Sequence, residues 1–489
     1  MVNKCQINSE TPETPFDPVE LEQGLVRAAS MLREFYEGLD SRRVSQGMPI
    51  TETVHAFSGT LGEQGVGLAQ ALDDVRDIVL PRAMAIPHPL YMGLLNSSPL
   101  VGGIVAESIV GAMNNNAGSW EQGPPFVAAE QEVIRCFREM LKLSVESTGI
   151  VLPGGSYAAL HALQLARDHQ FPAWRTNGAR SLSGDPRVYV SDASHFSAAR
   201  AAIAVGVAAE DVVRVPTNGR GQMDASALSR ILHADIQAGA LPLAVVATIG
   251  TTGTGAIDPL PKLVDLCREH AIWLHVDACY GGAGALLDEL APHFEGIEMA
   301  DSVAVDPHKW FFVPMVAGLL FTRHPGLELE VFDVDAPYIP AGELVDGFRR
   351  GLPTSRRSAG FAIWMALRAH GLRAVRVAVR SNVRLARRLE DRLRDEGFDV
   401  MEDGELSIAC VRWEPPGMPE AELDDLQSRI AAALVRSGEA WFGTVRAVGK
   451  IWLRFALVST FTRESHIDKF AKMLSSYAKM QCPVNARST

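Results

Sequence analysis

Short apolar runs alternate with amphipathic segments between residues 149 and 321, and this alternation constrains the fold more than any other feature of the sequence. Several runs are continuously apolar, which is typical of strands that are covered on both faces. Segments with helical spacing, such as 156–169 and 260–270, lie between them. We expect strands at 149–152, 188–190, 212–215, 244–249, 273–276, 302–305 and 318–321. This order predicts an α/β domain built on a largely parallel sheet.

The regions on either side of this alternation divide the chain into three predicted parts. Residues 1–95 form an N-terminal helical segment, and residues 17–38 within it have the spacing of an amphipathic helix. That helix packs either against its own domain or over a partner subunit, and the pattern does not separate these two alternatives. Residues 96–365 form the large domain. Residues 366–489 form a small C-terminal α/β domain with strands at 407–411 and 451–458.

The charge balance excludes some classes of partner. The 489 residues include 46 basic and 58 acidic side chains, a net charge of −12, whereas nucleic acids and anionic membranes bind basic surfaces. The arginine-rich stretch 368–388 is therefore interpreted as a solvated helix face. No apolar run approaches the roughly 20 residues that span a bilayer, and no signal-peptide core is present. The six cysteines lack metal-site spacing. We expect a cytoplasmic protein without a bound metal.

Two clusters that follow the first predicted strands have the chemistry of a ligand site. Gly154, Gly155 and Ser156 follow a strand and begin a helix, where backbone amides and the Ser156 hydroxyl can hold an anion. A tight turn without a ligand would use the same glycines. His195 follows the strand at 188–190. A histidine there is either a hydrogen-bonded loop residue or part of a site, because ligands gather at the carboxyl ends of parallel strands.

Two further clusters place ionisable groups at the ends of buried strands. Asp277 ends the run 273–276, where a carboxylate is costly unless a cation compensates it. A protonated pyridine nitrogen would do so, and a helix cap or an internal salt bridge is the simpler alternative. Lys309 follows 302–305 and precedes Trp310 and Phe311. Burial there would lower the pKa of its amine and make it a nucleophile, whereas a surface lysine would keep its charge.

Taken in order, these clusters resemble the group II decarboxylases that depend on pyridoxal phosphate (PLP). That family includes aromatic-L-amino-acid, glutamate, cysteine-sulfinate and 2,4-diaminobutyrate decarboxylases. The resemblance extends over nearly the whole chain and is most specific at 275–278 (HVDA) and 307–309 (PHK). It runs through 88–89, 114–124, 154–156, 192–195, 248–258, 275–278, 306–309, 335–338, 355–357 and 453–455.

The resemblance implies fold type I, a large PLP-binding domain with a small C-terminal domain, and a homodimer that acts on a small-molecule amino acid. It implies that Lys309 forms a Schiff base with PLP and that Asp277 pairs with the pyridine nitrogen. His195 would stack on the cofactor ring, and Tyr338 would supply a proton to the product carbon. The other implied cofactor contacts are Gly155, Ser156, Thr251 and His308.

The implied reaction is decarboxylation of an L-amino acid to the amine and CO₂. The alternatives are another PLP reaction on the same scaffold, such as an aldehyde synthase or an aminotransferase, and a relative without activity. Because relatives that form aldehydes differ at the loop tyrosine or the stacked histidine, the presence of Tyr338 and His195 favours plain decarboxylation.

The chain departs from the family pattern at the cofactor and in the substrate pocket. Asp306 stands where many relatives have asparagine. Because a carboxylate aimed at a phosphate would be repelled, we expect Asp306 to face elsewhere or to pair. Tyr157 and Ala159 also differ from the usual residues after the glycine turn. Where aromatic decarboxylases carry bulky aromatic side chains, this chain has smaller ones, and Ser97 is a candidate contact for the substrate carboxylate. The predicted substrate positions are Leu94, Ser97, Asn116 and Gly118, and they do not identify the substrate.

Overall fold

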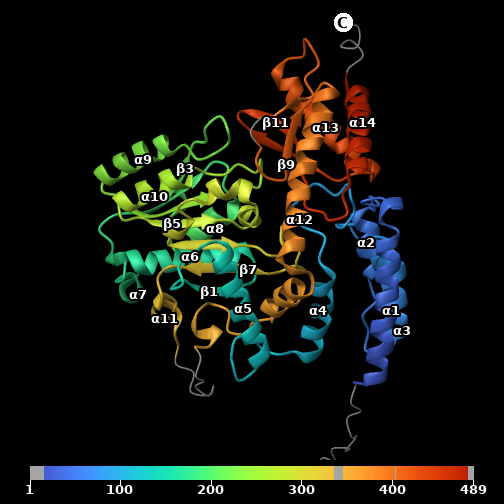
Figure 1. Cartoon of the computed structure of the whole chain (residues 1–489), viewed down its shortest axis with the longest axis horizontal. Coiled ribbons are helices and arrows are strands. Elements are labelled where there is room, and N and C mark those ends of the chain that lie inside the picture. The colour runs from blue at the N-terminus through green and yellow to red at the C-terminus, as the bar shows by residue number, and fades with distance from the viewer. Residues whose placement is uncertain (1–15, 335–344, 402–403, 483–489) are drawn as a thin grey trace, which may run out of the picture. The chain divides into compact units, whose positions relative to one another are not determined.

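The structure of the chain is a computed structural model, and it describes residues 16–334, 345–401 and 404–482. Its contacts divide the chain into two compact units, Met1–Ala85 and Ile86–Thr489. Figure 1 labels the helices and several of the strands.

The described part of the first unit, residues 16–85, is helical. Its helices are α1 (Pro18–Glu37), α2 (Ile50–Phe57) and α3 (Leu68–Asp74). The side chain of Asp17 accepts a hydrogen bond from the amide of Val19 and so caps the start of α1. Arg27 on α1 forms an ion pair with Asp73 on α3. The helix expected at 17–38 is therefore confirmed.

A seven-stranded sheet is the framework of the second unit. Its strands are β1 (Thr148–Leu152), β2 (Pro186–Ser191), β3 (Val212–Val215), β4 (Leu241–Thr248), β5 (Trp273–Asp277), β6 (Ser302–Val305) and β7 (Gly318–Thr322). Their order in the sheet is β1-β7-β6-β5-β4-β2-β3. The strands from β3 to β6 in this order are parallel, whereas β7 is antiparallel to both β6 and β1. The predicted strands and their largely parallel arrangement are confirmed.

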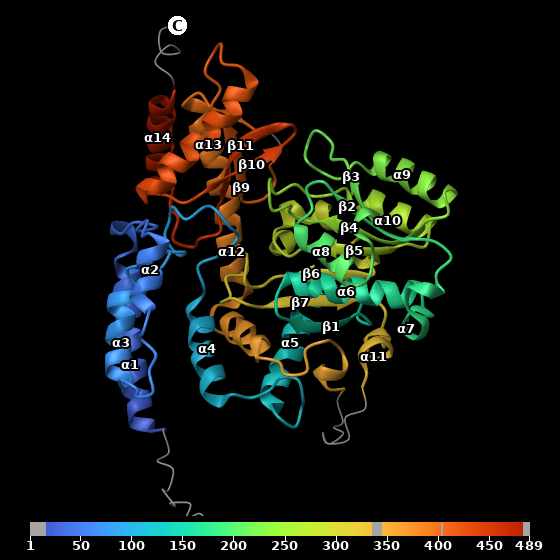
Figure 2. The same cartoon turned by 180° about the vertical axis from the view of Figure 1, so that it is seen from behind.

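Helices cover both faces of this sheet (Figure 2). Val188 and Val190 on β2 belong to a core that includes residues of α6 (Gly155–Gln170) and α8 (Phe196–Ala204). Tyr189, between them, belongs to a second core with α9 (Ala225–Gln237) and α10 (Leu260–Glu269). This alternation follows from the period of two along a strand. The remaining helices before the C-terminal part are α4 (Val101–Met113), α5 (Pro124–Met140), α7 (Trp174–Asn177) and α11 (Leu327–Phe332).

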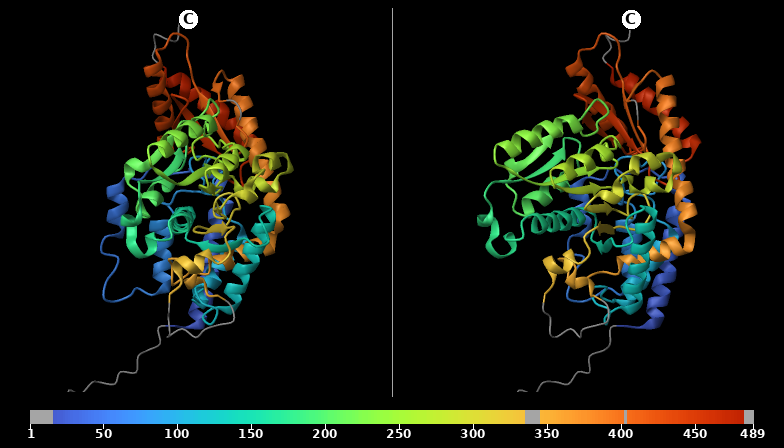
Figure 3. Two further views of the ribbon diagram at one scale, coloured as in Figure 1. Left: turned by 90° about the vertical axis from the view of Figure 1, so that its left-hand side faces the viewer. Right: turned by 60° about the vertical axis from the view of Figure 1, so that its left-hand side comes forward.

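The C-terminal part of the second unit contains an antiparallel sheet of order β10-β11-β9-β8, drawn in orange to red in Figure 3. Its strands are β8 (Asp399–Val400), β9 (Ile408–Arg412), β10 (Gly443–Ala447) and β11 (Lys450–Ala456). Its helices are α12 (Ala359–Asp395), α13 (Glu420–Ser437) and α14 (Glu464–Gln481). The strands expected at 407–411 and 451–458 are confirmed as β9 and β11.

Helix α12 runs through the predicted boundary between residues 365 and 366. Gly371 within it has φ of 74° and ψ of 153°, a conformation that glycine adopts readily, so α12 is two helices joined at a kink. The predicted boundary falls shortly before this kink and stays a prediction. The boundary predicted at 95 also stays a prediction, and the first compact unit ends earlier, at Ala85.

Several arginines of α12 pair with acidic side chains. Arg380 pairs with Glu289 at 2.8 Å and Arg388 pairs with Asp468 at 2.7 Å. Both side chains remain partly in solvent, which agrees with the expected solvated face. Among the described helices, none is long and apolar enough to cross a membrane.

Candidate active site

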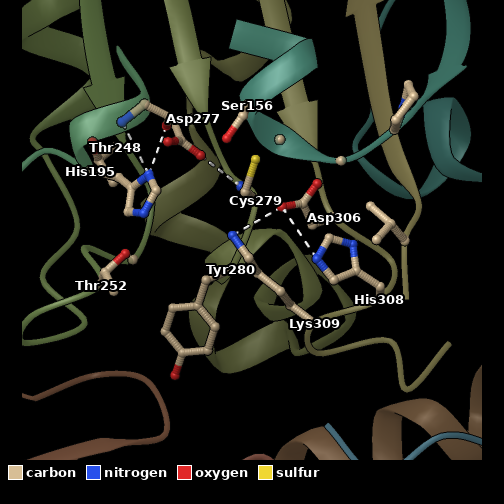
Figure 4. A pocket seen from close by; sticks show the side chains of 16 residues that line it. Ser156, His195, Thr248, Thr252, Asp277, Cys279, Tyr280, Asp306, His308 and Lys309 are labelled. Carbon is tan, nitrogen blue, oxygen red and sulfur yellow. Dashed lines mark hydrogen bonds and ion pairs between the residues drawn. The ribbon is translucent and has the colours of Figure 1, made fainter. Parts of the chain in front are cut away.

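A cavity of about 240 Å³ opens at the carboxyl ends of β2, β4, β5 and β6 and at the start of α6 (Figure 4). Ligands of open α/β sheets bind at this edge, because the loops that follow parallel strands meet there. The cavity is lined by Pro153, Gly154, Gly155, Ser156, His195, Ser197, Thr248, Gly250, Thr252, Asp277, Cys279, Tyr280, Asp306, His308, Lys309 and Val316.

The turn between β1 and α6 brings backbone amides to one wall of the cavity. Gly154 is the N-cap of α6 and has φ of 85°, in the region that favours glycine. A side chain at Gly155 would place its Cβ 2.6 Å from Cys279 Sγ, so only glycine fits this close approach. The amides of Gly155 and Ser156 lie in the first turn of α6, where no intrahelical acceptor exists. This helix start can therefore bind an anionic group.

His195 lies after β2 at the start of α8 and faces the same cavity (Figure 4). It is the N-cap of α8, and its Nδ1 accepts from the amide of Ser197 at 3.3 Å and lies 2.7 Å from the Ser197 hydroxyl. That contact assigns the proton of the neutral ring to Nε2. Burial lowers the pKa of His195, and the positive charge of Lys309 lowers it further. The imidazole is therefore neutral near pH 7.

Asp277 ends β5 with its carboxylate at the cavity. Its Oδ1 accepts a hydrogen bond of 3.0 Å from the amide of Cys279. Burial alone would raise the pKa of Asp277, but the charge of Lys309 and the Cys279 hydrogen bond bring it below its ordinary value. Among the described residues, no basic side chain forms an ion pair with Asp277. The internal salt bridge considered for this position is thus absent from the described part, and a charged carboxylate faces the cavity.

Lys309 lies in the loop after β6, beside two other polar side chains. Its Nζ is 2.9 Å from Oδ2 of Asp306, and the Lys309 side chain is 23% exposed. His308 Nε2 lies 3.9 Å from the same Asp306 oxygen, and His308 Nδ1 is 2.6 Å from the carbonyl oxygen of Ala317. Asp306 was expected to face away from the phosphate or to pair, and it forms an ion pair with Lys309.

The expected effect on the Lys309 amine was wrong in sign. Burial was predicted to lower its pKa, and burial is the largest single influence and acts in that direction, but the carboxylate of Asp306 and the neighbouring acidic groups together outweigh it. These neighbours are Cys279 and Asp277, and the pKa of Lys309 is raised above its ordinary value. Lys309 is therefore an ammonium in the free site, and its amine must lose a proton before it can act as a nucleophile.

A family model described as the pyridoxal-dependent decarboxylase conserved domain matches residues 57–414. The chain belongs to this decarboxylase family. The decarboxylase is 30% identical over 407 residues to L-2,4-diaminobutyrate decarboxylase of Rhizobium meliloti (strain 1021), a match that covers 82% of this chain and 80% of that protein. It is 23% identical over 480 residues to 4-hydroxyphenylacetaldehyde synthase of Rhodiola rosea, a match that covers 95% of this chain and 96% of that protein. Its fold matches the crystal structure of Oryza sativa TDC with PLP and tryptamine at a TM-score of 0.91 and 23% identity. The match covers 96% of this chain and 100% of that chain.

The predicted family and fold type I architecture are thereby confirmed. The decarboxylase is a carboxy-lyase of amino-acid metabolism, and its cofactor is PLP. The cavity offers what this cofactor needs: an amine for the aldehyde, an unpaired carboxylate for the pyridine nitrogen, and a helix start for the phosphate. The residues present therefore fit the group.

Most of the predicted cofactor residues meet at this cavity. Its lining includes Gly155, Ser156, His195, Asp277, His308 and Lys309. Thr251 is fully buried, and its hydroxyl accepts from the amide of Ala256 at 3.1 Å, while its neighbour Thr252 lines the cavity of the decarboxylase. A contact between Thr251 and PLP stays a prediction. Tyr338 lies outside the described residues.

The four predicted substrate residues are not part of the cavity lining. Ser97 is buried, and its hydroxyl lies 3.4 Å from the carbonyl oxygen of His308. Asn116 Oδ1 accepts hydrogen bonds from the amides of Gly118 at 2.8 Å and Arg356 at 2.9 Å. Leu94 is half exposed. A role of these residues toward the substrate of the decarboxylase stays a prediction.

Several lining residues were not predicted from the sequence. They are Pro153, Ser197, Thr248, Gly250, Thr252, Cys279, Tyr280 and Val316. Thr252, Cys279 and Tyr280 follow parallel strands within a few residues, and a search of every such position would have found them. Val316 precedes β7, which is antiparallel to β6, so the start of β7 lies at the same edge as the end of β6. The direction of β7 had no signal in the sequence.

Proposed function

We propose that the protein decarboxylates an L-amino acid to the corresponding amine and CO₂, with Lys309 as the amine that bonds the PLP aldehyde. The observation that carries this proposal is the shared cavity of Lys309 and Asp277 at the ends of the neighbouring strands β6 and β5. An amine and an unpaired carboxylate on one side of a sheet match the two reactive ends of a PLP ring.

The roles of the other lining residues follow from their chemistry. The bound cofactor supplies an electron sink for the pair that remains when CO₂ departs. Asp277 keeps the pyridine nitrogen protonated through its negative charge. The amides of Gly155 and Ser156, with His308, hold the phosphate, and the neutral ring of His195 covers one side of the site. In this proposal Thr251 supports the cofactor from the loop after β4.

The product depends on which atom receives a proton after CO₂ has left. His195 is neutral and carries its proton on Nε2, so it can hold or deliver one proton in the cavity. We assign the delivery to the product carbon to Tyr338 on the basis of the family resemblance. Aldehyde formation is the second candidate, because the chain is also similar to 4-hydroxyphenylacetaldehyde synthase.

The proposed assembly is a cytoplasmic homodimer. Val101, Val105, Ile109 and Met113 on α4 are all exposed and recur every four residues, so they form one apolar face of the helix. A second copy of the chain would cover such a face. Light scattering at micromolar concentration should give twice the chain mass; a monomer would contradict the dimer and leave the chemistry untouched.

Product analysis on the purified, PLP-loaded protein tests the reaction. Individual L-amino acids are supplied, and CO₂, amine, aldehyde, ammonia and peroxide are measured. Amine and CO₂ in equal amounts support the proposal. Aldehyde with ammonia and peroxide favours the second candidate, and CO₂ release from no amino acid contradicts both. Tyr338→Phe is expected to slow amine formation or to shift the product toward aldehyde, and unchanged products would remove Tyr338 from the mechanism.

A further inference from the structure

Asp306 occupies a position that the proposed chemistry does not yet explain. It follows β6, is 2% exposed, and its Oδ2 lies 2.9 Å from Lys309 Nζ (Figure 4). Its Oδ1 is buried and has no hydrogen-bond partner among the described residues. A Cβ on Gly155 would lie 2.7 Å from Asp306 Oδ2, so this carboxylate abuts the glycine turn. A negative charge thus stands beside the helix start that suits a phosphate.

Lys309 and Asp306 form an ion pair at the wall of the cavity. The ammonium compensates the buried carboxylate. Nζ can bond the cofactor aldehyde only after it has given up a proton, and Asp306 is the carboxylate in contact with it.

We propose, on the basis of the role proposed for Lys309, that Asp306 is the proton acceptor for Lys309 during cofactor capture. The proton on Nζ moves to Oδ2 of Asp306 across the 2.9 Å contact. The freed electron pair on Nζ forms a bond to the aldehyde carbon. The two hydrogens left on Nζ then leave with the aldehyde oxygen as water, and a C=N double bond remains. Asp306 holds the proton that left Nζ through these steps, so atoms and charge balance.

Other ionisable groups also face this pair. Asp277 and Cys279 act on Lys309 from the end of β5, and His195 lies near it at the start of α8. His308 approaches Asp306 within their own loop, at 3.9 Å. That distance exceeds a hydrogen bond, so His308 does not compete with Lys309 for Oδ2 of Asp306, which lies 2.9 Å from Nζ. Asp306 acts through Lys309 and is a positioning residue.

The pH dependence of capture distinguishes this role from a purely structural one. In the wild type the proton moves within the pair, so the fraction of neutral amine does not depend on solvent pH while the pair holds one proton. In Asp306→Asn the proton must go to water. The fraction of neutral amine then rises about tenfold per pH unit below the pKa of Lys309. PLP itself also titrates, but this effect is the same for both proteins and cancels when the Asp306→Asn rate is divided by the wild-type rate.

The experiment follows the visible absorbance after apoprotein is mixed with PLP, between about pH 6.5 and 8.5. It uses the wild type, Asp306→Asn, and Asp301→Asn as a matched control. Asp301 is also a buried, ion-paired carboxylate and stands at the opposite end of β6, where it pairs with Arg323. Borohydride reduction and peptide mapping after each reaction identify the lysine that bonded PLP.

The expected result is a rate ratio of Asp306→Asn to wild type that rises about tenfold per pH unit, while the ratio for Asp301→Asn stays constant. A constant ratio for Asp306→Asn, with PLP on Lys309, overturns the inference alone. Label on another lysine refutes the proposed function instead. If Asp306→Asn does not fold, the pH dependence of the wild-type rate is compared instead with that of the reaction between PLP and free butylamine. A wild-type rate that rises with pH as steeply as the butylamine rate overturns the inference.

Discussion

The indole nitrogen of Trp310 donates a hydrogen bond of 3.0 Å to the side-chain oxygen of Asn382 on α12. Asn382 donates in turn to the carbonyl oxygen of Ser459 at 2.9 Å. Trp310 is fully buried, and Asn382 is nearly so. The residue next to Lys309 is thus tied through one amide side chain to the long helix and to the segment after β11.

Replacing Asn382 by alanine is expected to destabilise the protein. The change leaves the Trp310 N–H and the Ser459 carbonyl buried without partners, and each costs about 1–3 kcal/mol. We expect a loss of about 3 kcal/mol in the free energy of unfolding, measured by urea denaturation. Asn177→Ala, at an exposed site on α7, should change it by less than about 0.5 kcal/mol. Equal stability of the two variants would contradict the bridging role of Asn382.

Lys309→Ala is expected to remove the covalent link to PLP. Without the amine, the visible band of lysine-bound cofactor should vanish and turnover should fall by at least about 10³-fold. Spectra and product assays check both effects. The exposed Lys262→Ala serves as the control and should keep the band and the activity. A Lys309→Ala protein with normal turnover would refute the assignment.

Asp277→Asn is expected to weaken the electron sink and leave the fold intact. The carboxylate has no basic partner in the described part of the chain, so its loss disturbs the cofactor rather than a salt bridge. The loss of one charge-assisted hydrogen bond corresponds to about a 100-fold drop in kcat/KM. Steady-state kinetics measure it, with the exposed Asp265→Asn as control. A change smaller than about threefold would separate Asp277 from the cofactor.

His161 gives the stability a pH dependence. It is buried on α6, and neither ring nitrogen has a hydrogen-bond partner among the described residues. Burial lowers the pKa of His161 to about 3, and the charges of Arg350 and Arg356 act in the same direction. Below the ordinary histidine pKa of about 6.5, the unfolded chain therefore binds a proton that the folded chain excludes. Stability is lost as the pH falls, by about 1.4 kcal/mol per unit from this residue.

Urea denaturation at pH 7, 6 and 5 measures this effect. His161→Leu should lose less stability than the wild type on acidification, by about 1.4 kcal/mol between the last two values. The exposed His233→Leu should follow the wild type. Parallel losses in all three proteins would show that His161 is not the group that titrates.

The strands and the groups that follow them were accessible from the sequence because both depend on local pattern. Continuous apolar runs predicted β4 and β5, and Asp277 and Lys309 stand out as charged residues at the ends of such runs. Parallel strands place their carboxyl ends at one edge, so these side chains meet without further information.

What the sequence could not predict depends on side-chain direction and on distant contacts. A carboxylate three residues before Lys309 is visible in the sequence, but its turn toward Nζ is not, and together with Cys279 and Asp277 it reverses the pKa shift of the lysine. Thr252 lines the cavity in place of the predicted Thr251, because the two residues face different sides of the loop. Strand β10 was not predicted, because its residues alternate between exposed and partly buried and form no apolar run. Its strand conformation depends on hydrogen bonding to β11, which the sequence does not show.

A crystal structure of the PLP-loaded protein tests the central claim most directly. The account predicts continuous density from Lys309 Nζ to the cofactor and an Asp277 carboxylate oxygen within about 3 Å of the pyridine nitrogen. A cofactor joined to another lysine, or a ring nitrogen that points away from Asp277, would contradict it.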